Sequence, residues 1–171
     1  MEIDALLRAL EATAVATAIR ENDSLFPWVE SFHVLAITLV IGTIAIVDLR
    51  LIGLASLDRA VARLTSEILP CTWGAFALAA ITGALLFSSN AFTYAHNSQF
   101  QTKMVFLLLA GINMAVFHVG AGRDLARWGG AHETTPPGAR IAGAVSLLFW
   151  ICVVSFGRWT GFTLHATPLV S

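Results

Sequence analysis

The sequence predicts an all-α integral membrane protein, a four-helix bundle that follows an amphipathic helix at the membrane surface. Two properties of the 171-residue chain predict this class. It is 57% hydrophobic and only 12% charged, whereas roughly 25% of the residues of a soluble domain are charged. Its apolar residues also gather into four stretches that reach or approach the ~20 residues needed to cross a bilayer as a helix.

Residues 1–20 predict the surface helix. Apolar residues recur there at helical spacing, and charged residues lie between them. A helix with one apolar and one charged face lies in the membrane–water interface, with its apolar face toward the lipid. The polar run Asn22–Ser24, followed by Pro27, then separates this helix from the first span.

The four spans are expected at about residues 26–54, 70–87, 103–121 and 139–162. Three connections separate them, and no repeat or low-complexity tract interrupts the pattern. Residues 1–171 are therefore expected to form a single transmembrane domain.

Arginine placement predicts the orientation of the bundle. The first and third connections, with the adjacent span ends, hold most of the arginines, whereas the basic residues of the other side are balanced by acidic ones. Loops rich in Lys and Arg stay on the cytoplasmic side, so we expect both termini outside. A formal net charge of −1 without a basic cluster gives no support for nucleic-acid binding. The arginines of the basic side are Arg50, Arg59, Arg63, Arg123, Arg127 and Arg140.

Glu30 and His33 are the most informative polar residues, because they lie inside the first span. A spacing of three places them on one helix face, and such groups in hydrocarbon need partners or a ligand. Arg158, near the same depth on the fourth span, is the expected ion-pair partner of Glu30. His33 could be a core histidine with a hydrogen-bond partner, a ligand of haem iron or a transition metal, or part of a proton or quinone path.

A haem b or copper site at His33 is the first functional hypothesis. The candidate metal ligands are His33, Glu30, His165 and Met104. His118 lies roughly 10–15 Å deeper at 1.5 Å per residue, so one haem bridging His33 and His118 is not expected.

Other residues could hold the cofactor itself. Gly83 and Gly111 lie at nearly the depth of His33 and could leave room for a flat ring. His96 lies on the same side of the membrane as His33, and Arg158 could pair with a haem propionate. Near the opposite membrane face, an inner polar cluster is expected from Asp48, Arg50, His118 and Arg123.

Two further hypotheses stay open. The chain could be a non-enzymatic assembly or anchoring subunit of a larger complex, in which buried polar groups only fix the register of the helices. It could also be a small transporter subunit with a polar path from Glu30 to Asp48. The motifs of soluble enzymes are absent, so no catalytic residue is assigned. The lipid bilayer is one partner, and a homo-oligomer or further membrane or periplasmic subunits are expected.

The chain resembles a family of small four-span bacterial inner-membrane proteins that is classed only as a domain of unknown function. The resemblance covers nearly the whole sequence. Its specific parts are the histidine-bearing first span, the DLRLIG segment at the end of that span, and the AGINMAVFH segment of the third span. It implies a bacterial inner membrane and no assigned reaction. More loosely, the layout is similar to bundles of the cytochrome b561 and copper-resistance D kind.

Overall fold

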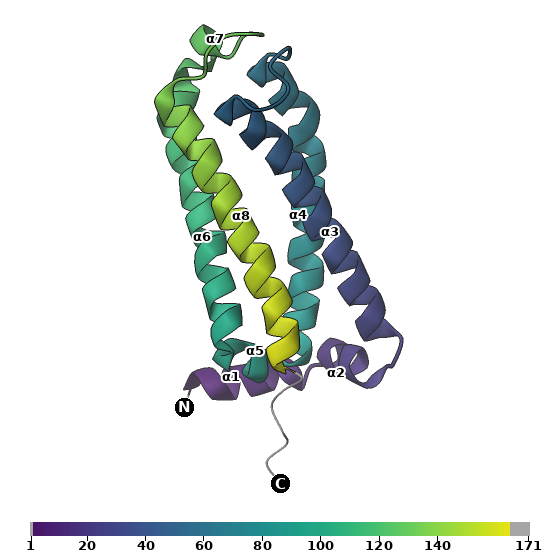
Figure 1. Ribbon diagram of the computed structural model, residues 1–171. Helices are drawn as coiled ribbons and strands as arrows, with labels where there is room; N and C mark the ends of the chain where they lie inside the picture. The colour runs from purple at the N-terminus through teal and green to yellow at the C-terminus, as the bar shows by residue number, and fades with distance from the viewer. Residues whose placement is uncertain (1, 165–171) are drawn as a thin grey trace.

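Four long helices form the body of the molecule, and the all-α prediction is confirmed. The structure is a computed structural model that describes residues 2–164, and no strand occurs in that part of the chain (Figure 1). The long helices are α3 (Leu25–Ile52), α4 (Val61–Ser89), α6 (Ser98–Val119) and α8 (Pro137–Leu164). All four are long and apolar enough to cross a membrane. Their outward faces carry exposed leucine, isoleucine and valine side chains, as lipid contact requires. The protein is therefore a membrane protein.

The helices pack as two pairs that meet along one line of contact. Helix α3 packs on α4, α6 packs on α8, and α3 also packs on α8, whereas α4 and α6 make little direct contact. Gly143 on α8 lies where α8 crosses α3. A Cβ atom at this glycine would lie 3.0 Å from the Asp48 carbonyl oxygen and 3.1 Å from the Leu51 Cβ. The missing side chain thus permits the close approach of the two backbones.

Three short helices cover one end of the bundle, which we call the α1 end. Helices α1 (Glu2–Glu11) and α2 (Ala14–Glu21) lie across the ends of the long helices, beside α5 (Ala91–His96) (Figure 1). The sequence predicted one helix over residues 1–20, and the structure has two. The chain breaks at Thr13, whose extended backbone and side-chain oxygen cap α2 by accepting from the Ala16 N–H.

Polar contacts tie these surface helices to the bundle. The Glu11 carboxylate accepts a hydrogen bond of 2.8 Å from the Phe92 N–H. The Arg20 guanidinium donates to the Ser89 carbonyl oxygen at 3.1 Å. The surface helices are therefore fixed to the turn between α4 and α5.

The second span is longer than the sequence predicted. It was expected to begin at Pro70, but α4 begins at Val61 and continues through Pro70. Proline removes one backbone donor, yet bundles in a membrane tolerate it where neighbouring groups satisfy the freed carbonyl. The predicted polar connection before the third span is likewise largely helical, as α5 and the first turn of α6.

The opposite end, which we call the α7 end, is built around the fully buried side chain of Arg50. Two loops meet there, and the second contains a 3₁₀ turn (Ala121–Asp124) and α7 (Leu125–Trp128). The Arg50 guanidinium donates to the Arg59 and Gly130 carbonyl oxygens, both at 3.0 Å, and to the Thr135 hydroxyl at 3.3 Å. Arg50 therefore holds the two loops to each other and to α3.

Candidate functional site

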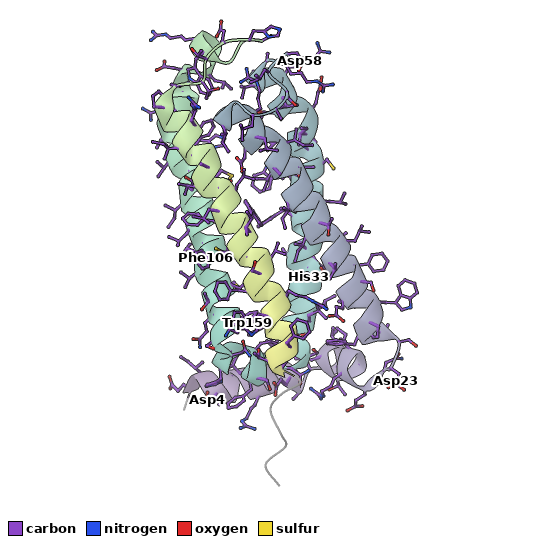
Figure 2. The ribbon with its side chains drawn as sticks, in the orientation of Figure 1. Asp4, Asp23, His33, Asp58, Phe106 and Trp159 are labelled. Carbon is purple, nitrogen blue, oxygen red and sulfur yellow. The ribbon has the colours of Figure 1, made fainter. Side chains whose placement is uncertain are left out.

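Cavities lie toward both ends of the bundle. The His33 cavity, of about 260 Å³, lies toward the α1 end (Figure 2). The Asp48 cavity, of about 340 Å³, lies toward the α7 end. They share no lining residue. Each therefore has to be considered as a separate site.

His33 is oriented by a threonine of the neighbouring helix. Its Nδ1 lies 2.9 Å from the Thr82 Oγ1 on α4. The Thr82 hydroxyl already donates to the Leu78 carbonyl oxygen at 2.7 Å, so it accepts the bond from the His33 Nδ1–H. The neutral imidazole then carries its free lone pair on Nε2. His33 thus has the hydrogen-bond partner that one of the three interpretations of this residue required. Its Nε2 makes no hydrogen bond within residues 2–164.

A glycine provides the space for the imidazole. A Cβ atom at Gly83 would lie 2.9 Å from the His33 Cε1, closer than real Cβ atoms come. The space beside Gly83, which was predicted to hold a flat cofactor ring, is taken by the imidazole of His33 itself.

Lys103 on α6 extends into the same cavity. It is the only lysine of the chain, and its aliphatic stem runs across Gly157 on α8. A Cβ atom at Gly157 would meet the Lys103 Cδ at 3.5 Å. The Lys103 Nζ lies 6.0 Å from the centre of the Phe100 ring. The lysine thus carries its charge from the edge of α6 toward the bundle interior.

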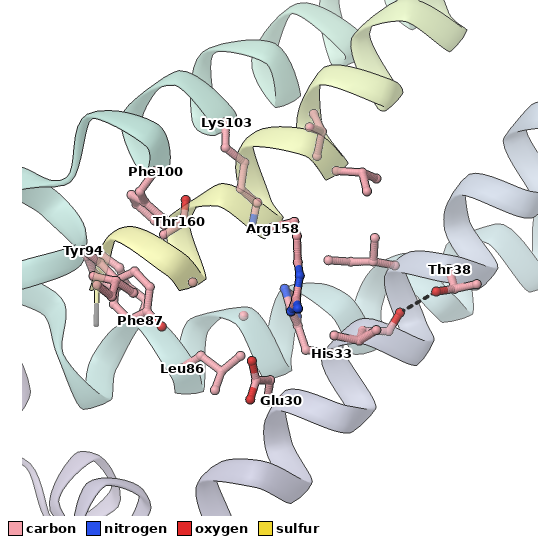
Figure 3. Close-up of a pocket in the computed structure, with 18 of the residues that line it drawn as sticks. Glu30, His33, Thr38, Leu86, Phe87, Tyr94, Phe100, Lys103, Arg158 and Thr160 are labelled. Carbon is pink, nitrogen blue, oxygen red and sulfur yellow. Dashed lines mark hydrogen bonds between the residues drawn. The ribbon is translucent and has the colours of Figure 1, made fainter. Parts of the chain in front are cut away.

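Glu30 and Arg158 line the cavity with His33 and Lys103, as Figure 3 shows. The predicted ion pair between Glu30 and Arg158 is not formed. The ion pairs within residues 2–164 involve other residues, and the Arg158 guanidinium instead lies 4.8 Å from the centre of the Phe162 ring on its own helix. The cavity therefore contains two cationic side chains and one carboxylate, none of them neutralised by an ion pair.

Aromatic residues form one wall of the cavity, where Phe87, Tyr94 and Phe100 gather (Figure 3). The Phe87 and Phe100 rings stack at 5.5 Å, and the Tyr94 ring lies 5.5 Å from Phe100. Burial, and to a lesser extent the Glu30 carboxylate, raise the pKa of the Tyr94 phenol. The phenol therefore stays protonated at neutral pH and offers a hydrogen-bond donor.

Of the other predicted ligands, Glu30 lines the His33 cavity, whereas His96 and Met104 do not. His96 on α5 bonds the Phe92 carbonyl oxygen through Nδ1, and its Nε2 lies 3.5 Å from Asp4. Met104 does not line the cavity and is 44% exposed on the outside of α6. His165 lies outside the described residues. Residues 2–164 contain no group of three His, Cys, Asp or Glu residues that could hold a metal ion.

The size and charge of the His33 cavity decide whether it could hold a haem or a bare copper ion. Its volume of about 260 Å³ lies below the roughly 300–1,000 Å³ of small-molecule sites, too little for a porphyrin. Two cationic side chains would also repel a metal cation. The described residues therefore do not fit either group at His33.

The structure brings together only two of the four residues of the predicted inner polar cluster. Asp48 and His118 line the Asp48 cavity. Arg50 binds loop carbonyls instead of Asp48, and Arg123 is exposed. Gly111, predicted at the level of His33, also lines the Asp48 cavity, because α6 begins five residues earlier than expected and α4 and α6 diverge.

Sequence reasoning missed Thr82 and the roles of Lys103 and Tyr94 in the His33 cavity. A signal existed for Lys103, because a lone lysine beside a span seldom lies there without a partner. No comparable signal existed for Thr82, since threonines are common in membrane helices.

A match to a known protein family covers most of the chain. The model of a family of unknown function, DUF6644, matches residues 23–163. The chain belongs to this family. No curated protein and no solved structure matches it. The predicted resemblance to a membrane family of unknown function is confirmed, whereas the looser similarity to cytochrome b561 and copper-resistance D bundles gains no support. Membership in DUF6644 assigns no reaction, so function rests on the site.

Proposed function

We propose that the protein is a membrane-embedded binding subunit whose His33 cavity takes a small acidic amphiphile. This ligand has one carboxylate or phosphate group and an apolar body. The observation that carries the proposal is the pair of cationic side chains, Lys103 and Arg158, that line one cavity and form no ion pair within residues 2–164. With a neutral His33, these two charges and the Glu30 carboxylate leave a net charge of about +1 in the cavity.

A monoanion complements this arrangement. Lys103 is half-buried, whereas Arg158 is exposed. A partly buried charge without a partner is costly, and ammonium and guanidinium groups form their strongest hydrogen bonds with carboxylate and phosphate oxygens. Glu30 opposes a second negative charge, which favours a ligand with one acidic group. The stacked Phe87 and Phe100 rings offer a surface to its apolar part.

His33 would supply a further polar contact. Its Nδ1 is occupied by Thr82, so Nε2 is the atom available to a ligand. A neutral Nε2 accepts a hydrogen bond from an acid that carries a proton, and a protonated Nε2 donates to an anion. The residue therefore suits an acidic head group in either protonation state.

Calorimetric titration of the protein in zwitterionic lipid nanodiscs tests the proposal. Octanoate and octyl phosphate are expected to bind, and octanol, which has the same chain without charge, is expected not to. Lys103→Met should weaken binding at least about tenfold, since a hydrogen bond to a charged group is worth ~1.5–3 kcal/mol. Arg127→Met, an exposed arginine at the α7 end, is the matched control. Equal binding of octanol and octanoate, or an unchanged affinity in Lys103→Met, would contradict the proposal.

The predicted orientation places the His33 cavity in the outer leaflet of a bacterial inner membrane, with the α1 end outside. This is part of the proposal, and it rests on the excess of arginine at the α7 end. In a variant with Cys71 and Cys152 replaced by serine, labelling of a single cysteine introduced at Asp23, and separately at Asp58, tests it in intact cells; the two positions lie at opposite ends (Figure 2). An impermeant maleimide should label only the first.

The sequence predictions of haem b and copper can be tested in the same purified sample. A Soret band that disappears in His33→Ala would support haem, and elemental analysis would detect copper. Transport along a continuous polar path is not favoured, because the two cavities share no lining residue. Oligomerisation and an assembly role stay predictions.

A further inference from the structure

The Asp48 cavity contains a buried acid whose charge nothing in the described part of the chain balances. Asp48 is 6% exposed and lines the cavity. Its Oδ2 is buried and has no hydrogen-bond partner, and none of the ion pairs within residues 2–164 involves it. An orphaned carboxylate oxygen in a membrane helix bundle needs a partner from outside the chain.

The nearby arginines do not supply that partner. The Arg50 guanidinium is turned toward the loops and is committed to the Arg59 and Gly130 carbonyl oxygens. Arg123 is exposed and does not line the cavity. Among the described residues no lysine or arginine lines the cavity, and His118 is the one basic side chain in its wall. The fold thus supplies no permanent positive charge there to balance Asp48.

Four of the polar side chains that line the Asp48 cavity have their donors already in use. Thr43 and Thr72 each donate their hydroxyl proton to a carbonyl oxygen four residues earlier in the same helix, at 2.8 and 3.1 Å. The Asn113 Nδ2 donates to the Ala142 carbonyl oxygen of α8 at 3.0 Å. The His118 Nδ1 lies 2.8 Å from the Met114 carbonyl oxygen, which leaves Nε2 as an acceptor on the neutral ring. Ser146 of α8 also lines the cavity and hydrogen-bonds Asp48, and the Trp73 and Trp150 indoles add N–H donors. All of these donors are neutral, so none of them balances the charge of an Asp48 carboxylate.

The rest of the lining is apolar and aromatic. Trp73 and Phe76 of α4, Phe117 of α6 and Trp150 of α8 contribute rings to the cavity wall. Aromatic faces attract cations. The cavity therefore combines one acid, several acceptors and aromatic surface, and it lies between α4 and α6, where the helices make little contact.

We infer that the Asp48 cavity binds a small organic cation, a protonated primary amine with an apolar body. The ammonium group forms an ion pair with the Asp48 carboxylate, and its remaining N–H groups have acceptors nearby. The apolar body occupies the space among the tryptophan and phenylalanine rings. This site differs from the His33 cavity in place and in the sign of the charge it takes.

Calorimetric titration with 3-phenylpropylammonium in zwitterionic nanodiscs tests the inference. Its controls are 3-phenylpropanol, which has nearly the same shape without charge, and 3-phenylpropionate, which has the opposite charge. The ammonium should bind at least about tenfold more tightly than the alcohol, since charge-assisted hydrogen bonds exceed neutral ones by this amount. Asp48→Asn should abolish the difference, and Asp58→Asn, an exposed aspartate at the same end, should keep it.

A second pair of variants keeps the test valid if Asp48→Asn does not fold. A Cβ atom at Gly111, which lines the cavity, would meet nothing within 4 Å. Gly111→Leu is therefore expected to take up cavity volume without altering charge. Gly42 has equally open surroundings and lines neither cavity, so Gly42→Leu is its control. The inference predicts loss of ammonium binding in Gly111→Leu alone. Absence of binding to the unmodified protein, equal binding of the alcohol, or binding that survives Gly111→Leu would each overturn it.

Discussion

The two ends of the bundle use their arginines in opposite ways. At the α7 end, Arg50 is buried and every hydrogen bond it donates goes to the loops that close the bundle. At the α1 end, Arg158 and Lys103 line a cavity and form no ion pair within residues 2–164. The same kind of charge therefore stabilises the fold at one end, whereas at the other it is available to the ligand that we propose. The difference depends on whether loop carbonyls lie within reach of the side chain.

His33 and Asp48 on α3 differ in the same respect, because the fold supplies a partner to one and leaves an atom of the other without one. His33 finds a hydroxyl on α4, whereas Asp48, which lies on the same interior side of α3, has an oxygen atom without a partner. Polar groups inside a membrane are costly unless they are satisfied. Those that the fold leaves unsatisfied identify sites better than the mere presence of a charge in a span.

The largest expected effect is that of removing the Arg50 contacts. Arg50→Met should lower the free energy of unfolding by about 3 kcal/mol, because buried carbonyl oxygens of both loops lose a charged donor. Thermal unfolding in detergent measures the loss, and proteolysis of the loops should accelerate. Arg63→Met is the control, since Arg63 is exposed and pairs only with Glu67 at 3.0 Å. If both variants have the same stability, Arg50 does not hold the loops.

A smaller effect should separate the two glycines of the His33 cavity. Gly83→Ala places a methyl group 2.9 Å from the His33 Cε1, so the imidazole has to move away from Thr82. We expect a loss of about 1–3 kcal/mol in unfolding free energy, as for other overpacked sites, and weaker octanoate binding. Gly157→Ala, where the new contact with Lys103 would be an ordinary 3.5 Å, should be nearly neutral. Equal stability of the two variants would show that His33 is not held against α4.

Thr82→Val tests the hydrogen bond of His33 without changing the volume of the side chain much. Removing the hydroxyl leaves the imidazole Nδ1–H without its acceptor, at a cost of about 1 kcal/mol. The histidine ring signals in NMR spectra should shift, because the bond that fixes the tautomer is lost. Thr38→Val is the matched control, since Thr38 lines the same cavity but bonds only the Val34 carbonyl oxygen of its own helix. A His33 spectrum that is unchanged in Thr82→Val would contradict the assigned bond.

The sequence predicts the parts of this molecule that depend on periodicity and composition. Four spans and an interior face of α3 with His33 and Asp48 follow from apolar runs and a spacing of about 100° per residue. The partners of Arg50 do not follow, because they are backbone atoms of loops nine to eighty residues away. The sequence also does not show that His33 bonds Thr82, or that Glu30 and Arg158 do not pair. Depth in the membrane alone does not fix the rotation of neighbouring helices. A site of this kind needs the packing of four helices before its contacts can be named.

The smallest effect, and the most local, concerns the single tyrosine of the chain. Because the chain has only one tyrosine, an ultraviolet pH titration of phenolate absorbance reports on Tyr94 alone. Its pKa is raised by burial and by the Glu30 carboxylate, so the folded protein should titrate above the usual value near 10. Glu30→Gln should shift the midpoint down toward that value, because it removes the negative charge that opposes ionisation, while burial keeps part of the rise. Glu67→Gln, at the other end of the bundle, should leave the midpoint unchanged. A bound octanoate in the unmodified protein should raise it further, since a second negative charge then lies beside the phenol. An unchanged midpoint in Glu30→Gln would mean that the carboxylate does not face the aromatic wall, and the charge balance proposed for the His33 cavity would no longer hold.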